Sequence, residues 1–289
     1  MTTVRVAVPR KGRPLEAVLE RVAAISGAED HVDSIASTLR YEKAVTKDTQ
    51  TPEDDVYDRL TTYSSTDRYE PEYTLLRDSR PGVPRRIVFD SLRVNLGDDV
   101  LHLVGREEPF RALRKHEFAL GFDSADLVLE EVVGIEPEPL SSLEALNDRI
   151  DPRDTDVRVA AGLGDTVHHT LLSTPDIAES PTRTFLEEYE GPLCISPRYE
   201  RLVEAVLGTD VIEGVSFRYP GDREAEAAIA SVGIGVYLTV TGSTAREHGL
   251  RVGEKLFPSE TVLLENTAER DDRTAAVADM LAGEVGTIA

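Results

Sequence analysis

Short apolar, β-branched runs recur along the chain, and the segments between them carry apolar residues at helical spacing. The pattern opens with VRVAVP, a β-rich run, followed by the basic loop RKGR and by PLEAVLERVAAI, whose apolar residues recur every three or four positions. Strands are also predicted for VRVAAGL, PLCIS, GVSFRY, IGVYLTV and TVLLEN, and helices for YERLVEAVLG and RTAAVADMLAGEV. Strands that alternate with helices over most of a chain predict an α/β fold with largely parallel sheets.

Two stretches interrupt this alternation. Residues 45–70 are rich in Thr, Asp, Glu, Ser and Tyr with little periodicity, which predicts an exposed excursion, and YTLLRD, RRIVFDSLRV and DVLHLV then predict a small antiparallel insertion. The segment EPEPLSSLEALNDRIDPRDTD is typical of a connection between domains. We therefore predict two α/β lobes: residues 1–150 and 256–289 form the first, with an insertion at about 45–103, and residues 151–255 form the second.

The charge of the chain indicates its habitat more than its chemistry. It carries 54 acids and 32 bases, only five of them lysine, for a formal net charge of −22. The acids occur in nearly every segment, which is typical of proteins from concentrated salt, where the Debye length of about 3 Å screens self-repulsion. Such a charge disfavours a nucleic-acid partner. We see no leader and no membrane-spanning apolar run, so we predict a cytoplasmic protein without membrane contact.

Cysteine and histidine often have catalytic or metal-binding roles, but in this sequence we interpret both as structural. Cys194, the single cysteine, lies in the apolar run PLCIS and is predicted to be a buried small hydrophobe that is neither nucleophile nor disulfide partner. His168 and His169 are adjacent and have no further His or Cys nearby, so we predict a surface or capping role and no metal site.

The strongest chemical candidate is the turn in VYLTVTGSTAREHGL, residues 236–250. Thr241, Ser243 and Thr244 offer hydroxyl donors after an apolar strand, and Gly242 lets the backbone approach a ligand closely. In open α/β sheets ligands bind beyond the carboxyl ends of strands, where amides at helix N-termini attract anions. A phosphate group would fit there; the alternative is a helix merely capped by Ser243 or Thr244.

Several motifs in this order resemble ATP phosphoribosyltransferase, the first enzyme of histidine biosynthesis. The turn resembles the family's phosphoribosyl-diphosphate loop, acid-x-x-x-Thr-Gly-x-Thr, and residues 221–224 stand where the family has a Gly-Ser-x-Glu turn. AVPRKGR resembles the family's Pro-Lys-Gly-Arg loop, and LVGREEPFRALRKHEFALGFDSADLVLEE, DVRVAAG and GPLCISPRYERLVEAV resemble its successive strands and helices.

The resemblance implies two periplasmic-binding-protein-like (type II) lobes with a substrate cleft between them. Phosphoribosyl diphosphate, carrying Mg²⁺, would place its 5-phosphate on residues 241–244, and N1 of ATP would displace the diphosphate. Lys11 and Arg13 would neutralise phosphate charge, although both remain interpretable as surface charge. Glu224 is the candidate carboxylate that balances positive charge on the ribose.

The chain also departs from the family pattern. Tyr237 occupies the place of the loop's acid, Asp222 replaces a neutral hydroxyl, and the insertion lengthens the first lobe. We expect a divergent member or paralogue that lacks the C-terminal regulatory domain and forms a homo-oligomer or binds a regulatory subunit. Two other functions stay open: a non-catalytic sensor of small anions or nucleotides, motivated by Tyr237, and a structural partner that acts through residues 45–104.

Overall fold

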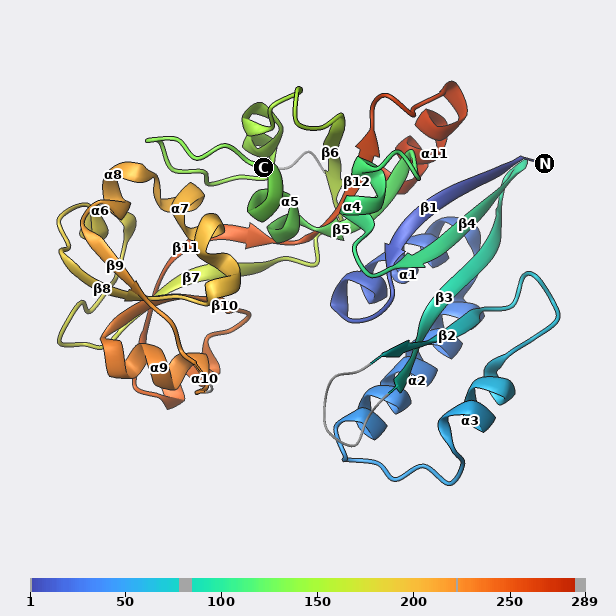
Figure 1. Ribbon diagram of the computed structural model, residues 1–289, viewed down its shortest axis with the longest axis horizontal. Helices are drawn as coiled ribbons and strands as arrows, with labels where there is room; N and C mark the ends of the chain where they lie inside the picture. The colour runs from blue at the N-terminus through green and yellow to red at the C-terminus, as the bar shows by residue number, and fades with distance from the viewer. Residues whose placement is uncertain (1, 78–84, 222, 284–289) are drawn as a thin grey trace. The chain divides into compact units, whose positions relative to one another are not determined.

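The structure, a computed structural model, describes residues 2–77, 85–221 and 223–283. The chain forms two α/β units and passes between them four times (Figure 1). Unit 1 comprises Met1–Asp123, Asp156–Leu163 and Thr261–Ala289, and unit 2 comprises Ser124–Thr155 and Gly164–Glu260. None of the described helices is long and apolar enough to cross a membrane.

Unit 1 is built on a seven-stranded sheet in the order β2-β3-β4-β1-β5-β12-β6. β1 pairs in parallel with β4 and β5, whereas β3 runs antiparallel to β2 and β4, and β6 antiparallel to β12. The predicted insertion strands therefore form, but they extend the main sheet through β4 instead of making a separate subdomain. Their bounds are β1 (Thr3–Pro9), β2 (Glu72–Arg77), β3 (Arg85–Leu96), β4 (Asp99–Arg106), β5 (Leu120–Ser124), β6 (Val157–Gly162) and β12 (Thr261–Asn266).

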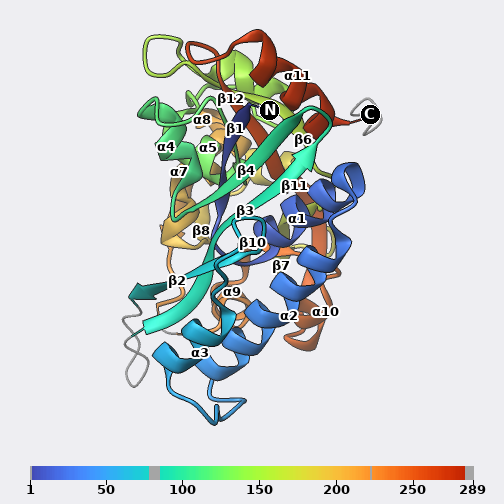
Figure 2. The same ribbon diagram turned by 90° about the vertical axis from the view of Figure 1, so that its right-hand side faces the viewer.

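Helices α1 (Arg13–Ser26) and α2 (Glu29–Thr46) lie side by side along one face of this sheet (Figure 2). Their buried residues, including Leu15, Val18 and Ile35, pack with Phe89 of β3 in the larger apolar core. α4 (Pro109–Arg114) packs against β1, β4 and β12, and α11 (Asp272–Ala282) packs against α1 and β12.

The excursion predicted for residues 45–70 contains a helix, α3 (Val56–Tyr63). Its sequence lacks a long apolar stripe, but Asp55 caps it by accepting hydrogen bonds from the amides of Tyr57 (2.7 Å) and Asp58 (3.0 Å). Polar contacts and a buried arginine hold this helix, so a search for apolar periodicity misses it.

Unit 2 is built on a five-stranded sheet in the order β11-β7-β10-β8-β9. β10 pairs in parallel with β8 and antiparallel to β7. The strands are β7 (Val167–Ser173), β8 (Gly191–Cys194), β9 (Val215–Arg218), β10 (Ile234–Thr239) and β11 (Arg251–Ser259). The helices are α5 (Ala125–Val132), α6 (Arg183–Glu187), α7 (Glu200–Leu207), α8 (Thr209–Ile212), α9 (Ala225–Val232) and α10 (Ser243–Glu247), with short 3-10 turns at Glu144–Arg149 and Pro197–Tyr199.

The strand order confirms the predicted fold class. In each sheet, one strand that enters directly from the other unit lies between the parallel strands and an edge strand: β12 lies between β5 and β6, and β7 lies between β10 and β11. Both inserted strands pair antiparallel to a neighbour. This repeated order is the type II arrangement of periplasmic-binding-protein-like lobes.

The division between the units differs from the one drawn from the sequence, which placed residues 124–150 in the first lobe. In the structure this segment belongs to unit 2, because α5 packs against α7 and β11, while residues 156–163 return to unit 1, where β6 pairs with β12. An amphipathic pattern shows that a helix has a buried face, but not which sheet covers it.

The two structural interpretations drawn from residue type have different outcomes. Cys194 is 2 % exposed and burial raises the pKa of its thiol, which confirms it as a buried residue. The surface role predicted for the histidine pair is wrong for His169, which is 1 % exposed and places Nε2 3.2 Å from Oδ1 of buried Asp126. Ser259 donates a hydrogen bond to the other carboxylate oxygen of Asp126 at 2.9 Å.

Half-buried His102 on β4 makes the stability of unit 1 depend on pH. Burial, and then the charges of Arg93 and Arg5, lower the pKa of His102 on β4 to about 4. Below pH 6.5 the unfolded chain binds a proton at this histidine that the folded chain does not bind. The free energy of unfolding therefore keeps its full value above pH 6.5 and decreases by about 3 kcal/mol as the pH falls to 4. In His102→Gln, we expect denaturant titrations to show a smaller loss between pH 6.5 and 4; an unchanged loss would contradict this assignment.

Candidate functional site

The hydroxyl-rich turn follows β10 and leads into α10 in unit 2. Its own groups hold its shape: Thr241 and Ser243 bond through their hydroxyls at 3.1 Å, and Arg246 donates a hydrogen bond from Nη1 to the carbonyl of Thr241 at 2.9 Å. Neither Ser243 nor Thr244 is the N-cap of α10, because Gly242 holds that position. The alternative of a helix capped by one of those hydroxyls is therefore wrong.

Gly242 is required for a reason beyond close approach of a ligand. Its φ of 70° lies in the left-handed region, and a Cβ at this position would lie 2.7 Å from Cγ2 of Val252. A larger residue would meet both backbone strain and this contact.

The turn lines a pocket of about 280 Å³. Residues 238–245 form most of its wall, and Glu226 from the first turn of α9 completes it. Four hydroxyl residues, Thr239, Thr241, Ser243 and Thr244, and one acidic residue thus line a single hollow at the carboxyl end of β10. Donors that suit a phosphate lie beside an acid that suits a developing positive charge.

Tyr237 does not supply the acid that its position in the loop pattern requires. It is half-buried beside an apolar cluster that includes Cys194, Ile229 and Leu250. Burial, and then the charge of Glu226, raise the pKa of its phenol above 10. Tyr237 is therefore neutral at any physiological pH, and the nearby carboxylate is Glu226.

Glu224, the carboxylate singled out from the sequence, has a different environment. It is the N-cap residue of α9, its side chain is 79 % exposed, and Oε2 lies 3.7 Å from Nε2 of His248 at the end of α10. It is not among the residues that line the pocket at the turn. Asp222, the other departure in this segment, lies outside the described residues.

Lys11 and Arg13 belong to unit 1, where β1 leads into α1. Gly12 between them has a φ of 81°, which allows the sharp turn into a helix whose first residue is Arg13. Lys11 is exposed and lines a different pocket, of about 540 Å³, whereas Arg13 is half-buried. Within the described residues, no group of three or more His, Cys, Asp or Glu is placed to hold a metal ion.

Comparison with known families places these motifs in context. A family described as "Halobacterial ATP phosphoribosyltransferase" matches residues 1–288. The chain belongs to this family. The match extends through the insertion and both units, so residues 45–103 are part of the halobacterial family's own pattern. No curated protein sequence matches the chain.

The solved structures that resemble this member of the halobacterial ATP phosphoribosyltransferase family share little sequence with it. An "ATP phosphoribosyl transferase (HisG:HisZ) complex from Thermotoga maritima" has 15% identity and a TM-score of 0.42, covering 96% of each chain. The regulatory domain of the LysR-family regulator MetR from N. meningitidis has 10% identity and a TM-score of 0.33, covering 97% of this chain and 92% of its own. A histidine kinase sensor domain similar to periplasmic binding proteins has 14% identity and a TM-score of 0.31, covering 64% and 69%.

The sequence located the turn but missed Glu226, the acid that lines the same pocket as the turn. The signal was present: Glu226 follows Glu224 by two residues, at the start of a segment whose remaining residues are mostly small and apolar. Only the packing of α9 on β10 decides which of the two carboxylates faces the pocket.

Proposed function

We propose that this family member catalyses phosphoribosyl transfer, joining N1 of ATP to the ribose of phosphoribosyl diphosphate. The bond between the anomeric carbon and the diphosphate oxygen breaks, the bond from N1 forms, and diphosphate leaves with the electron pair. Membership of the family over the whole chain supports the reaction class. The single observation that carries the assignment of the donor site is the pocket where residues 241–244 and Glu226 meet.

In this proposal, the 5-phosphate of the donor binds the backbone and hydroxyls of Thr241, Gly242, Ser243 and Thr244. A carboxylate balances the positive charge that develops on the ribose. Glu226 has the position for this task, and Glu224 is the rival that the family pattern favours. Lys11 and Arg13 neutralise phosphate charge.

Magnesium would arrive with the diphosphate of the donor. Mg²⁺ typically binds substrate phosphates with one or two carboxylates and several waters, and does not need a cage of protein ligands. The carboxylate of Glu226 beside the turn fits such a supporting role. When bound, the ion would neutralise charge on the leaving diphosphate.

The test is a product assay with the purified full chain in high salt. We expect ATP, phosphoribosyl diphosphate and Mg²⁺ to yield phosphoribosyl-ATP and diphosphate in equal amounts, detected by mass spectrometry and a diphosphate assay. Omitting Mg²⁺ should abolish both products. If no purine nucleotide gives a product and no diphosphate is released, the transferase proposal fails.

A second candidate is a non-catalytic sensor or regulatory paralogue that binds the donor or another small anion at the turn. The neutral, half-buried Tyr237 in place of the loop's acid favours it. Calorimetry that shows binding of phosphoribosyl diphosphate by a protein without turnover would support this function, whereas turnover would exclude it.

We also propose a cytoplasmic protein adapted to concentrated salt that assembles as a homo-oligomer or with a regulatory subunit. The excess of acids over bases supports the salt adaptation, because a charge of −22 needs screening. Light scattering of the purified chain at molar salt measures its oligomeric state. A monomeric mass would exclude the homo-oligomer and leave assembly with a regulatory subunit as the remaining alternative.

A further inference from the structure

Buried polar residues gather beside the four crossings that carry the chain between the two units. The crossings lie at residues 123/124, 155/156, 163/164 and 260/261. In the described part of the chain fourteen polar or charged residues are buried, and six of them lie within three residues of a crossing: Asp123, Asp126, Thr155, Ser259, Glu260 and Thr261. The burial of polar groups is therefore concentrated where the two units are joined.

Glu260 joins two of the crossing segments through its side chain. It is the last residue of unit 2 before β12 and is 8 % exposed. Its Oε1 accepts a hydrogen bond from the amide of Gly164 at 2.5 Å, and its Oε2 accepts one from the hydroxyl of Thr166 at 2.9 Å. Gly164 is the first residue of unit 2 after β6, so the carboxylate connects the segment that enters unit 2 with one that leaves it.

The backbone of Glu260 contacts a third crossing segment. Its carbonyl accepts a hydrogen bond from the amide of Ala125 at 2.9 Å, and Ala125 follows the crossing from β5 by two residues. One residue further along the chain, in unit 1, the carbonyl of Thr261 accepts from the amide of Leu163 at 2.9 Å. Glu260 thus bonds residues beside two other crossings and itself lies at a third.

A second carboxylate connects the same three segments. Asp126, in the first turn of α5, accepts a hydrogen bond from Ser259 at 2.9 Å, and its other oxygen lies 3.2 Å from Nε2 of His169 on β7. All three side chains are at most 5 % exposed. We call the residues around the two carboxylates the crossing cluster: Ala125, Asp126, Gly164, Thr166, His169, Ser259 and Glu260.

Cohesion alone does not explain the polar character of the crossing cluster, because apolar side chains would provide it equally well. A buried hydrogen bond adds little net stability, whereas a buried polar group that loses its partner is costly. Partial opening of such a network is therefore disfavoured, and segments that share it keep their bonds or lose them together.

We propose that the crossing cluster acts as a single hinge, in which Glu260 couples three crossing segments so that they open together. Any motion of one unit relative to the other must pass through the crossings, because they are the covalent links between the units. The coupling makes the three segments respond as one. This inference concerns conformation and does not rest on the transfer reaction proposed above.

Hydrogen exchange at single amides, followed by NMR on the full chain without ligand, tests the coupling. The variant Glu260→Gln removes the charge and leaves one acceptor oxygen where the carboxylate has two. Of the bonds described above, only those from Gly164 and Thr166 depend on this side chain. The amides of Ala125 and Leu163 donate to backbone carbonyls, which the substitution leaves in place.

We expect all three amides to exchange faster in Glu260→Gln than in wild type. The expected factor is about tenfold or more for Gly164, which loses a hydrogen bond to a charged group, and roughly tenfold for Ala125 and Leu163, because their segments open with it. Faster exchange at Gly164 alone would overturn the proposal, since the carboxylate would then affect only its own neighbour. Unchanged exchange at all three amides would overturn it as well.

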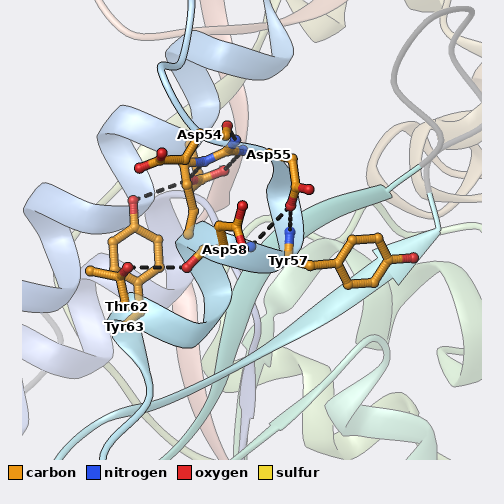
Figure 3. Close-up of polar contacts among 8 residues, drawn as sticks. Asp54, Asp55, Tyr57, Asp58, Thr62 and Tyr63 are labelled. Atoms are coloured by element: carbon orange, nitrogen blue, oxygen red, sulfur yellow. Dashed lines mark hydrogen bonds and ion pairs between the residues drawn. The ribbon is translucent and has the colours of Figure 1, made fainter.

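Asp55→Asn is the matched control. The carboxylate of Asp55 also accepts two hydrogen bonds, from the amides of Tyr57 and Asp58, but it lies in unit 1 and far along the chain from every crossing (Figure 3). We expect faster exchange near α3 and wild-type exchange at Ala125 and Leu163. Equal acceleration of these two amides in the control would indicate a general loss of stability and would contradict the coupling.

A second variant keeps the test informative if thermal melts show that Glu260→Gln is poorly folded. Thr166→Val removes one donor to Glu260 and keeps the size of the side chain. We expect it to accelerate exchange at Ala125 and Leu163 by a smaller factor than the glutamine variant. Wild-type rates at both amides in a folded Thr166→Val variant would also overturn the proposal. Failure of the transfer assay does not affect these results, because no turnover is measured.

Discussion

Replacing Glu226 by glutamine is expected to lower kcat of the proposed transfer by about 10²–10³-fold, the usual effect of removing one electrostatic contact to a transition state. The amide keeps the size and hydrogen-bonding capacity of the side chain but removes its charge. That charge is needed when the anomeric carbon becomes positive, and much less when the neutral ribose binds. KM for phosphoribosyl diphosphate should therefore change little, and steady-state kinetics at saturating ATP measures both constants.

Glu224→Gln is the matched control, because it removes the same charge from the same helix two residues earlier. Glu224 is 79 % exposed and faces His248 instead of the pocket, so we expect kcat to fall by less than about tenfold. The opposite ranking, a large loss in Glu224→Gln and a small one in Glu226→Gln, would return the catalytic role to the residue that the family pattern selects.

The sequence predicted those elements whose own pattern determines them. The run VRVAVP and the helix after it are β1 and α1, and IGVYLTV followed by the hydroxyl turn are β10 and its exit. These segments carry a local signal, either alternation or helical spacing, that their packing reinforces. The α/β class and the two-lobed arrangement follow from such signals.

Other elements depend on contacts between distant residues, which no local pattern records. β7 and β11 pair with each other, and each has a polar residue at a buried position, His169 or Ser259, that contacts Asp126 on α5. Their periodicity is weak for that reason. The pocket of about 540 Å³ in unit 1 is a similar case, because Lys11, Lys43 and Arg86 are far apart in the chain and meet only when β3 joins the main sheet.

The candidate site shows the same limit at the level of single residues. The turn could be predicted from the sequence because residues 241–244 are consecutive. Which carboxylate lines the pocket, that of Glu224 or that of Glu226, depends on the rotation of α9 about its axis. A two-residue step along a helix turns a side chain by about 200°. The family motif fixes the approximate position of an acid, and packing decides which carboxylate reaches the pocket.

The largest expected effect on stability comes from Arg59→Met. The Arg59 side chain is 10 % exposed and that of its partner, Glu42, is 2 % exposed, so this substitution leaves an uncompensated carboxylate in the interior. Breaking such a pair costs about 3–5 kcal/mol, because the remaining charge keeps its desolvation penalty and loses its attraction. Chemical denaturation of the full chain measures the loss in the free energy of unfolding.

The surface pair Arg251–Glu179 provides a matched control. Its nitrogen and oxygen are 2.9 Å apart, close to the separation in the buried pair, but its side chains are 45% and 72% exposed. Water already solvates both charges, so Arg251→Met is expected to cost no more than about 1 kcal/mol. A comparable loss in the two variants would show that burial is not what makes the Arg59 pair important.

The double variant Glu42→Met/Arg59→Met distinguishes an unpaired charge from lost packing. If the cost of Arg59→Met arises from the isolated carboxylate of Glu42, then replacing both residues should recover most of the stability, because a buried ion pair contributes little net free energy compared with apolar side chains of similar size. If the cost instead arises from the hydrogen bond that Arg59 donates to the carbonyl of Asp54, the double variant stays as unstable as the single one.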